Sequence, residues 1–352
     1  MSLPGDALAR AELLISLGRH DEALTTLAPT LREEPDNNYA LCLTAQANLQ
    51  LDRPEAARRA AEAAIKADPS SEWPFRLMSI ALRESGDSAQ AVEMAMRSVR
   101  MEPNLWEPRA ILAIALSELT ASRHRAKRVA DSAVAIAPQE PQAHFVVGLV
   151  ADRLGRQGDA ENAYRRALKL NPQHAAARNN LSVILSRRGD YIGAARGFTE
   201  AAVVDPRLSI ARRNVDFVVV RMIQRAQLVI LFTTFAVIAG PRLLGLDTRL
   251  VSICAAATGL GLIGWSILRF RSSTPRRLHR YLATLPGRDR LATAWVSLLA
   301  VAMLLLCVAS TLPGDARLWG LLSAVAALVC ATLLSYAHAT RGKRRPRGRT
   351  SS

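Results

Sequence analysis

Residues that often carry catalysis or bind metals are sparse in this chain of 352 residues. The four cysteines, Cys42, Cys254, Cys307 and Cys330, form no C-x-x-C pair, the spacing typical of metal or redox sites. The six histidines are scattered, and none lies four residues from another as a zinc-binding helix pair would. No phosphate-binding glycine loop, nucleophile elbow or dinucleotide fingerprint is present. The sequence therefore predicts no enzyme, no metal site and no cofactor, and recognition of another molecule becomes the main question.

The elements that would position a recognition surface are marked by a regularly spaced proline. The six prolines, separated by 34, 34, 35, 34 and 34 residues, are Pro35, Pro69, Pro103, Pro138, Pro172 and Pro206. Because proline lacks a backbone donor and disfavours helix at the preceding residue, a helix should end just before each one. Alanine stands twelve residues ahead of all six: Ala23, Ala57, Ala91, Ala126, Ala160 and Ala194. A small residue also stands five ahead, so two helices per unit can approach closely.

This pattern resembles the tetratricopeptide repeat (TPR), a helix-turn-helix unit of about 34 residues. The fifth unit matches the repeat motif best, at His144, Val147, Gly148, Ala151, Ala160, Tyr164 and Pro172. The fourth unit departs from it, with one extra residue around Ala121 to Arg125. The resemblance implies an all-α superhelical solenoid of six repeats over residues 1–206, with units ending near 35, 69, 103, 138, 172 and 206. A capping and connecting helix is expected over 207–225.

A glycine followed by an acidic helix cap is predicted between the two helices of several units. The four predicted turns are Gly18 to Asp21, Gly86-Asp87, Gly158-Asp159 and Gly189-Asp190. Pro54 is expected in the first helical turn of the second unit.

The remainder of the chain has a different composition. Residues 1–206 hold 25 Lys and Arg against 26 Asp and Glu, whereas residues 207–352 hold 21 against 4. Long uncharged runs in this second part predict a four-helix transmembrane bundle over 222–340, since each run can cross about 30 Å of hydrocarbon. The predicted spans are 222–241, 250–268, 291–312 and 318–340. A basic cytoplasmic loop, 269–290, and a basic disordered tail, 341–352, complete the expected organisation.

Arginine and lysine concentrate in alternate connections, which predicts a multi-pass plasma membrane protein with both termini in the cytoplasm. Anionic lipids are the expected partners of the basic loop and tail, and no nucleic acid is expected. The loop can be read as a short interfacial helix over Leu278 to Leu285 or as an irregular basic loop. The predicted membrane-interface residues are Trp265, Arg276, Arg277, Arg280, Trp295, Trp319 and Tyr336.

A partner-binding groove is what the TPR resemblance implies for function, with the first helix of each unit lining the concave wall. The candidate groove residues are Gln46, Trp73, Arg76, Arg83, Phe145, Arg153, Asn179, Asn180 and Arg187. Apolar positions alternate with Arg and Asn, which favours a peptide or helix that offers aliphatic anchors and carboxylate or backbone acceptors. Each residue could equally lie on a solvated face or between repeats.

Three functions remain open at this stage. The leading hypothesis is a membrane-anchored TPR scaffold of bacterial type that recruits a protein partner to the cytoplasmic face of the membrane. The alternative is a regulatory or structural subunit of a transporter or channel complex, and a membrane enzyme ranks lower. A homo-oligomer is possible, and the partner's identity is not written in the chain.

Overall fold

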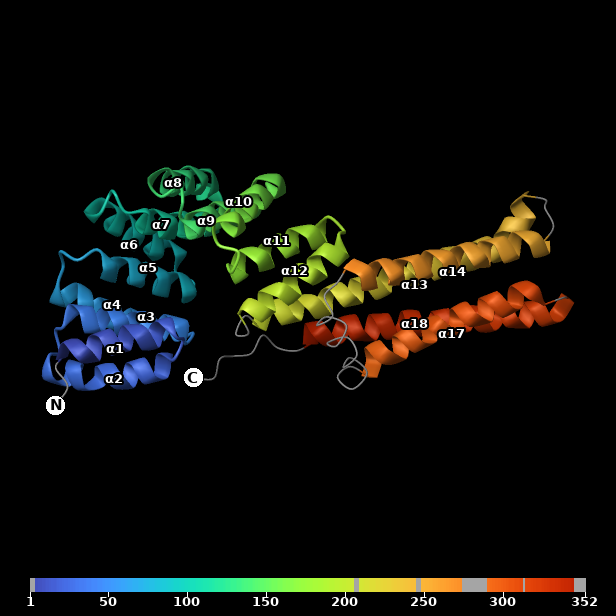
Figure 1. The fold of residues 1–352 in the computed structure, drawn as a ribbon, viewed down its shortest axis with the longest axis horizontal. Helices are drawn as coiled ribbons and strands as arrows, with labels where there is room; N and C mark the ends of the chain where they lie inside the picture. The colour runs from blue at the N-terminus through green and yellow to red at the C-terminus, as the bar shows by residue number, and fades with distance from the viewer. Residues whose placement is uncertain (1–3, 206–208, 245–247, 274–289, 313, 345–352) are drawn as a thin grey trace. The chain divides into compact units, whose positions relative to one another are not determined.

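The computed structural model describes residues 4–205, 209–244, 248–273, 290–312 and 314–344 (Figure 1). All elements in these ranges are helical. The chain divides into two compact units, Met1–Ala177 and Arg178–Ser352.

The helices of the first unit form antiparallel pairs, one pair per repeat, that stack in chain order (Figure 1). Their bounds are α1 (Pro4–Ser16), α2 (His20–Glu33), α3 (Asn38–Gln50), α4 (Pro54–Ala67), α5 (Trp73–Glu84), α6 (Ser88–Met101), α7 (Trp106–Glu118), the 3-10 helix η1 (Thr120–Ser122), α8 (Arg123–Ile136), α9 (Pro141–Arg153) and α10 (Gln157–Leu170). The remaining helices are α11 (Ala175–Arg187), α12 (Tyr191–Val204), α13 (Ser209–Leu244), α14 (Thr248–Ser273), α17 (Arg290–Thr311) and α18 (Gly314–Arg344).

Each of the six spaced prolines follows the end of a helix, as predicted. The helices α2, α4, α6, α8, α10 and α12 all end two residues before their proline. The intervening residue lies outside the helical region in every case, with φ between −142° and −124° and ψ between 72° and 97°. This is the conformation that a following proline imposes, so the proline interval predicts where the second helix of every unit ends.

The small residues in fixed register lie at the centre of each helix pair. All six alanines that stand twelve residues ahead of a proline are completely buried. The six residues five ahead of a proline are buried as well: Thr30, Ala64, Ser98, Ala133, Ala167 and Ala201. Small side chains here let helix axes approach closely, and the prediction of close helix packing is confirmed.

A residue with left-handed backbone conformation separates the two helices of most repeats. The residues at this position have φ between 58° and 91°: Gly18, Asp52, Gly86, Gly155 and Gly189. The prediction for the fifth unit was wrong, because Gly155 makes the turn and Gly158 lies inside α10. Of the predicted acidic caps, Asp87 and Asp190 accept a backbone N–H bond at their helix start, at 3.0 and 2.9 Å. Asp21 and Asp159 lie instead within the first turn of their helices.

The first helices of successive repeats form one continuous layer. α3 contacts α1 and α5, and α7 contacts α5 and α9, whereas the second helices make no comparable contacts with one another in the described residues. Helices that approach one another more closely lie on the inner side of a curved stack. The layer formed by α3, α5, α7 and α9 is therefore the inner wall of the first compact unit.

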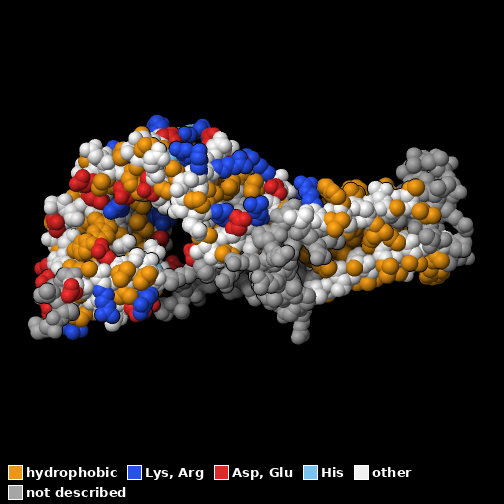
Figure 2. All heavy atoms as spheres, in the orientation of Figure 1, with side chains coloured by type: hydrophobic (Ala, Val, Ile, Leu, Met, Phe, Trp, Pro, Cys, Tyr) orange, Lys and Arg blue, Asp and Glu red, His pale blue; other side chains and the backbone are white. Residues whose placement is uncertain are grey.

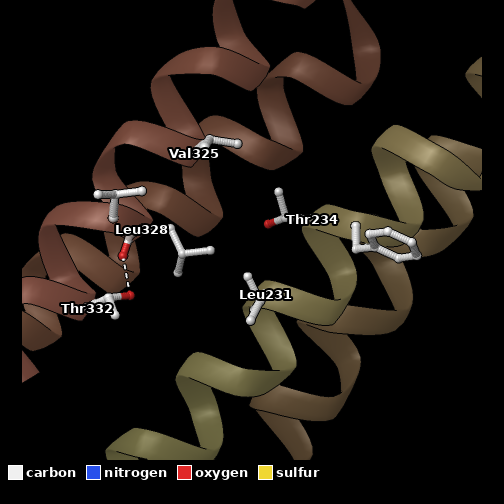
Figure 3. A pocket seen from close by; sticks show the side chains of 7 residues that line it. Leu231, Thr234, Val325, Leu328 and Thr332 are labelled. Atoms are coloured by element: carbon white, nitrogen blue, oxygen red, sulfur yellow. Dashed lines mark hydrogen bonds between the residues drawn. The ribbon is translucent and has the colours of Figure 1, made fainter.

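The second unit packs α12 to α18 around small and aliphatic side chains. Trp295 of α17 is completely buried, and its indole N–H donates to Gln227 of α13 at 3.0 Å. Gln227 in turn donates to Thr332 of α18 at 2.7 Å, which links three helices. A cleft of about 310 Å³ runs between α13 and α18, and Leu231, Thr234, Leu328 and other side chains line it (Figure 3). Apolar side chains also form much of this unit's outer surface (Figure 2).

The predicted transmembrane bundle and the predicted multi-pass location must be corrected. Among the residues that the structure describes, no helix combines the length and the apolar character needed to cross a membrane. The sequence prediction relied on the length of uncharged runs, which does not distinguish a membrane span from a helix packed against other helices. In the structure such runs fill helix contacts, as Leu299, Leu306 and Ala331 do in the cluster around Trp295.

The predicted membrane-interface residues do not share one environment. Trp295 is buried, contrary to the prediction, whereas Trp265 is exposed and stacks against the guanidinium of Arg269 at 5.1 Å. Trp319 is also exposed. Tyr336 lies in α18, but its side chain is outside the described part. The arginines at 276, 277 and 280, and the proposed helix over 278–285, lie outside the described residues.

Substitution of Gly148 tests the close approach of α9 and α10. A methyl group at this position would lie 2.5 Å from a ring carbon of Tyr164, which is itself buried. We expect Gly148→Ala to lower the free energy of unfolding by about 1–3 kcal/mol, because the ring has no room to move. The matched control is Gly158→Ala in α10, where nothing lies within 4 Å. The control should be neutral or stabilising by up to about 1 kcal/mol, and urea unfolding of both variants would measure the difference.

Candidate partner-binding groove

The inner wall of the first unit exposes one narrow stripe of each first helix. In α5 the stripe consists of Trp73, Arg76, Ile80 and Arg83, spaced three or four residues apart, while most other α5 side chains are buried. This spacing places the four side chains on one helix face. Trp73, Arg76 and Arg83 are candidates that the sequence analysis selected, and all four side chains are half-buried and so partly accessible to solvent.

An aliphatic row crosses neighbouring repeats at the middle of this wall. Ile80, Ile114 and Leu149 occupy the same register in α5, α7 and α9, and Gln46 holds the equivalent position in α3. All four are half-buried. Because they recur once per repeat, they form a line that runs across the first helices.

Aromatic side chains lie beside this row. The rings of Tyr39 and Trp73 are 5.5 Å apart, and the Tyr39 hydroxyl donates to Glu12, which raises the pKa of Tyr39 to about 12. Phe145 contacts the ring of Tyr164 at 5.9 Å and that of His174 at 4.9 Å. The ring contacts restrict motion of the aromatic groups, so they present fixed apolar surface at low entropic cost.

The groove arginine Arg76 is already paired within the protein. Its guanidinium lies 3.2 Å from Glu72 and 4.0 Å from Glu107, which belongs to the next repeat. Glu72 also accepts a hydrogen bond from Ser98 at 2.7 Å. Arg76 therefore links successive repeats through carboxylates that the protein supplies.

A second ionic cluster surrounds Glu118 at the end of α7. Its carboxylate lies 3.5 Å from Arg83 of α5 and 3.3 Å from Arg153 of α9, and it accepts a bond from Ser88 at 2.8 Å. Arg153 also donates to Ser117 and to the carbonyl of Ile114, at 2.5 and 3.2 Å. One glutamate thus joins three consecutive repeats.

These contacts change the roles expected for the groove arginines. The sequence hypothesis had Arg76, Arg83 and Arg153 available for a partner's carboxylates, whereas in the structure each is engaged with glutamates of the chain. Sequence reasoning missed Glu107, Glu118 and Ile114 because the fourth unit contributed no residue to the predicted wall. Counting 34 residues forward along the sequence finds them: Trp73 leads to Glu107, Ile80 to Ile114 and Glu84 to Glu118.

The candidates in the second unit are also engaged. The Asn179 amide donates to Asn180 at 3.1 Å and its carbonyl oxygen accepts from Asn214 at 3.0 Å, which ties α11 to α13. Asn179 is buried, Asn180 is half-buried and Arg187 is exposed. The asparagines therefore form a packing contact within this unit.

His174 connects the fifth repeat to the start of α11 through both ring nitrogens. Its Nδ1 accepts the backbone N–H of Ala177 at 3.2 Å, as a helix cap does, and its Nε2 lies 2.9 Å from the Gln142 side-chain oxygen. These two partners require a neutral ring with the proton on Nε2. Burial lowers the pKa of His174, which favours the same neutral form.

The family comparison agrees with the repeat geometry. A family model described as tetratricopeptide repeat matches residues 8–72 and 153–208. Tetratricopeptide repeats are thus recognised in these two segments of the chain. The matched residues include most of the first repeat, all of the second, the helix α10 and the sixth repeat, so the match falls on both sides of the irregular fourth repeat.

Solved structures share the fold at low sequence identity. A tetratricopeptide repeat protein from Parabacteroides merdae is 12% identical with a TM-score of 0.55, over 61% of this chain and 84% of that one. The Cut9–Hcn1 hetero-tetramer of the APC/C gives 17% identity and a TM-score of 0.51, over 59% of this chain and 41% of that one. No curated protein matches the sequence. At these identities the likeness concerns the repeat fold alone.

Removal of one charge tests the ionic cluster around Glu118. We expect Glu118→Gln to lower the free energy of unfolding by about 1–2 kcal/mol, because two arginines then face each other without their shared carboxylate. The control Glu62→Gln removes an exposed pair with Lys66 in α4 and should cost less than about 0.5 kcal/mol. Urea unfolding should show the difference at low salt and a smaller one at high salt. Equal effects of the two substitutions would contradict the role of Glu118.

The His174 cap predicts a pH dependence of stability. Because the folded pKa lies below the unfolded value of about 6.5, the cap stabilises the fold fully above that pH and is lost as pH falls through the folded pKa. His174→Asn keeps a side-chain acceptor but does not titrate, so this part of the pH dependence should disappear. Thermal unfolding across this range would measure it, with His124→Asn as the control at an exposed position of α8. An unchanged profile in His174→Asn would refute the assignment.

Proposed function

We propose that this protein is a TPR scaffold whose first unit binds a protein segment along the inner wall of α3, α5, α7 and α9. The observation that carries this proposal is the half-buried apolar row of Ile80, Ile114 and Leu149, with Trp73 beside it. Solvent-accessible apolar side chains in line across a curved wall are a typical binding surface for a peptide or helix.

The apolar side chains supply most of the binding free energy in this proposal. A partner carboxylate that paired with Arg76 or Arg153 would have to compete with Glu72, Glu107 or Glu118, which already satisfy these cations. Apolar contact requires no such exchange, and buried aromatic and aliphatic anchors dominate many interfaces. The ionic clusters then define the borders of the site.

The spacing of the apolar row limits the kind of segment that fits. Neighbouring packed helices lie about 8–10 Å apart. Successive apolar side chains of the row are therefore separated by roughly the same distance. An extended segment rises about 3.3 Å per residue and would place an apolar side chain at every third position. A helix rises about 1.5 Å per residue and would place one at every seventh. Both remain candidate ligands of the same wall.

The repeat content supports a protein partner over a small molecule. One of the similar folds, Cut9–Hcn1, is an assembly of two kinds of protein chain. In this chain, the described residues contain no group of three or more His, Cys, Asp and Glu side chains placed to hold a metal ion. A scaffold role needs only the surface that the repeats provide, and it requires no catalytic group.

Peptide selection on the purified full chain tests the proposal directly. One displayed library should place apolar residues at every third position and another at every seventh, with the remaining positions polar. We expect one library to yield binders whose affinity falls about tenfold or more in Trp73→Ala and in Ile80→Asp, since each removes an anchor.

The matched control is Arg59→Asp, an exposed change on α4 that leaves the inner wall intact. It should leave the affinity unchanged, and circular dichroism should show that all three variants keep their helices. Binders that are equally weakened by all three substitutions, or unaffected by the two wall substitutions, would refute the groove assignment.

A further inference from the structure

The outer helix α8 differs from the other second helices in its charge. Four Lys and Arg residues and one His fall within its first six positions: Arg123, His124, Arg125, Lys127 and Arg128. Its only acidic residue is Asp131. Figure 2 shows Lys and Arg side chains gathered along the edge of the first unit that carries α8 and α10.

The positions of these cations oppose helix formation. Arg125 and Arg128 are three residues apart, and Arg123 and Lys127 are four apart, which are the spacings at which like charges repel on a helix. Cations in the first turn also face the positive end of the helix dipole. The helices α2, α4 and α10 carry acidic residues in their first turns, and α6 and α12 have an aspartate cap. Only α8 among these second helices lacks both.

Few of these charges are neutralised within the described part of the protein. Lys127 pairs with Asp131 at 2.7 Å, and Arg125 reaches only the sulfur of Met96, at 3.7 Å. For Arg128 and His124, both exposed, no carboxylate lies within ion-pair distance in the described residues. The Nε atom of Arg123 is buried without a hydrogen-bond partner there. Arg125 and Arg128 therefore form an exposed positive surface with no paired carboxylate among the described residues.

We infer that the positive face formed by Arg125 and Arg128, one turn apart on α8, docks an acidic segment of a partner protein. A row of carboxylates would relieve both the repulsion between the arginines and the unfavourable dipole interaction, so binding restores a balance that the free helix lacks. Residues that break local rules without compensation are expected at functional sites. The surface lies on an outer helix, apart from the inner wall, so this inference does not depend on the proposed groove.

An acidic peptide is a better match to this surface than nucleic acid. Residues 1–206 carry slightly more acidic than basic residues, so the positive surface is local and the repeats lack the broad basic field of nucleic-acid-binding domains. No Phe, Tyr or Trp occurs in α8 to stack on a base. A short helix face with arginines one turn apart suits carboxylates that repeat along a peptide.

Fluorescence anisotropy with the full chain tests the inference, using a fluorescein-labelled peptide of alternating glutamate and alanine. We expect binding that weakens as salt increases, and at least about tenfold weaker binding to the double variant Arg125→Gln/Arg128→Gln. The melting temperature of this variant should stay the same or rise, because the substitutions remove a repulsive pair. Weaker binding with unchanged or higher stability separates a lost site from a damaged fold.

The matched control is Arg58→Gln/Arg59→Gln on α4, which removes the same charge from another exposed outer helix. It should retain the peptide affinity, as should Trp73→Ala on the inner wall. If the α4 and α8 variants lost peptide affinity equally, the net charge of the protein would explain the binding, and the inference would be overturned. Absence of peptide binding would overturn it, and so would tighter binding of a single-stranded DNA competitor at the same arginines.

Discussion

Close contact between the two helices of each repeat is the constraint on which the first unit depends. At the centre of every pair lies an alanine that is completely buried, and a second small residue lies two turns further along the same helix. A larger side chain at either position would push the helices apart. Because the same spacing recurs in each repeat, every helix pair has a similar shape. The first helices of the repeats therefore come together in one layer. The inner wall follows from this packing.

Charge on the inner wall serves mainly to hold neighbouring repeats together. Glu72, Glu107 and Glu118 pair with arginines of the same or adjacent repeats. In the proposed groove, the aliphatic row is therefore the part of the wall that a partner would contact. Recognition on such a surface depends on shape and apolar contact, and the ionic clusters preserve the curvature that presents it.

The fourth repeat interrupts an otherwise regular series. Where other units turn through one left-handed residue, this unit has the short helix η1 and then enters α8 with a series of cations. Both features depart from what helix stability alone would favour. The irregular turn and the cations therefore lie side by side in one repeat, on the outer side of the solenoid.

The repeat number, the helix ends before Pro35 to Pro206 and the buried alanines could all be predicted from the chain, because these depend on local backbone chemistry and on short-range register. Pairing across repeats could not. Whether Arg153 meets a partner or Glu118 depends on how α7 and α9 stack, and the choice of Gly155 over Gly158 depends on where α10 begins. The long uncharged runs were equally compatible with a membrane span and with helix packing, since both bury apolar side chains. Only the folded arrangement, in which Trp295 is enclosed and bonded to Gln227, decided between an exposed anchor and a core residue.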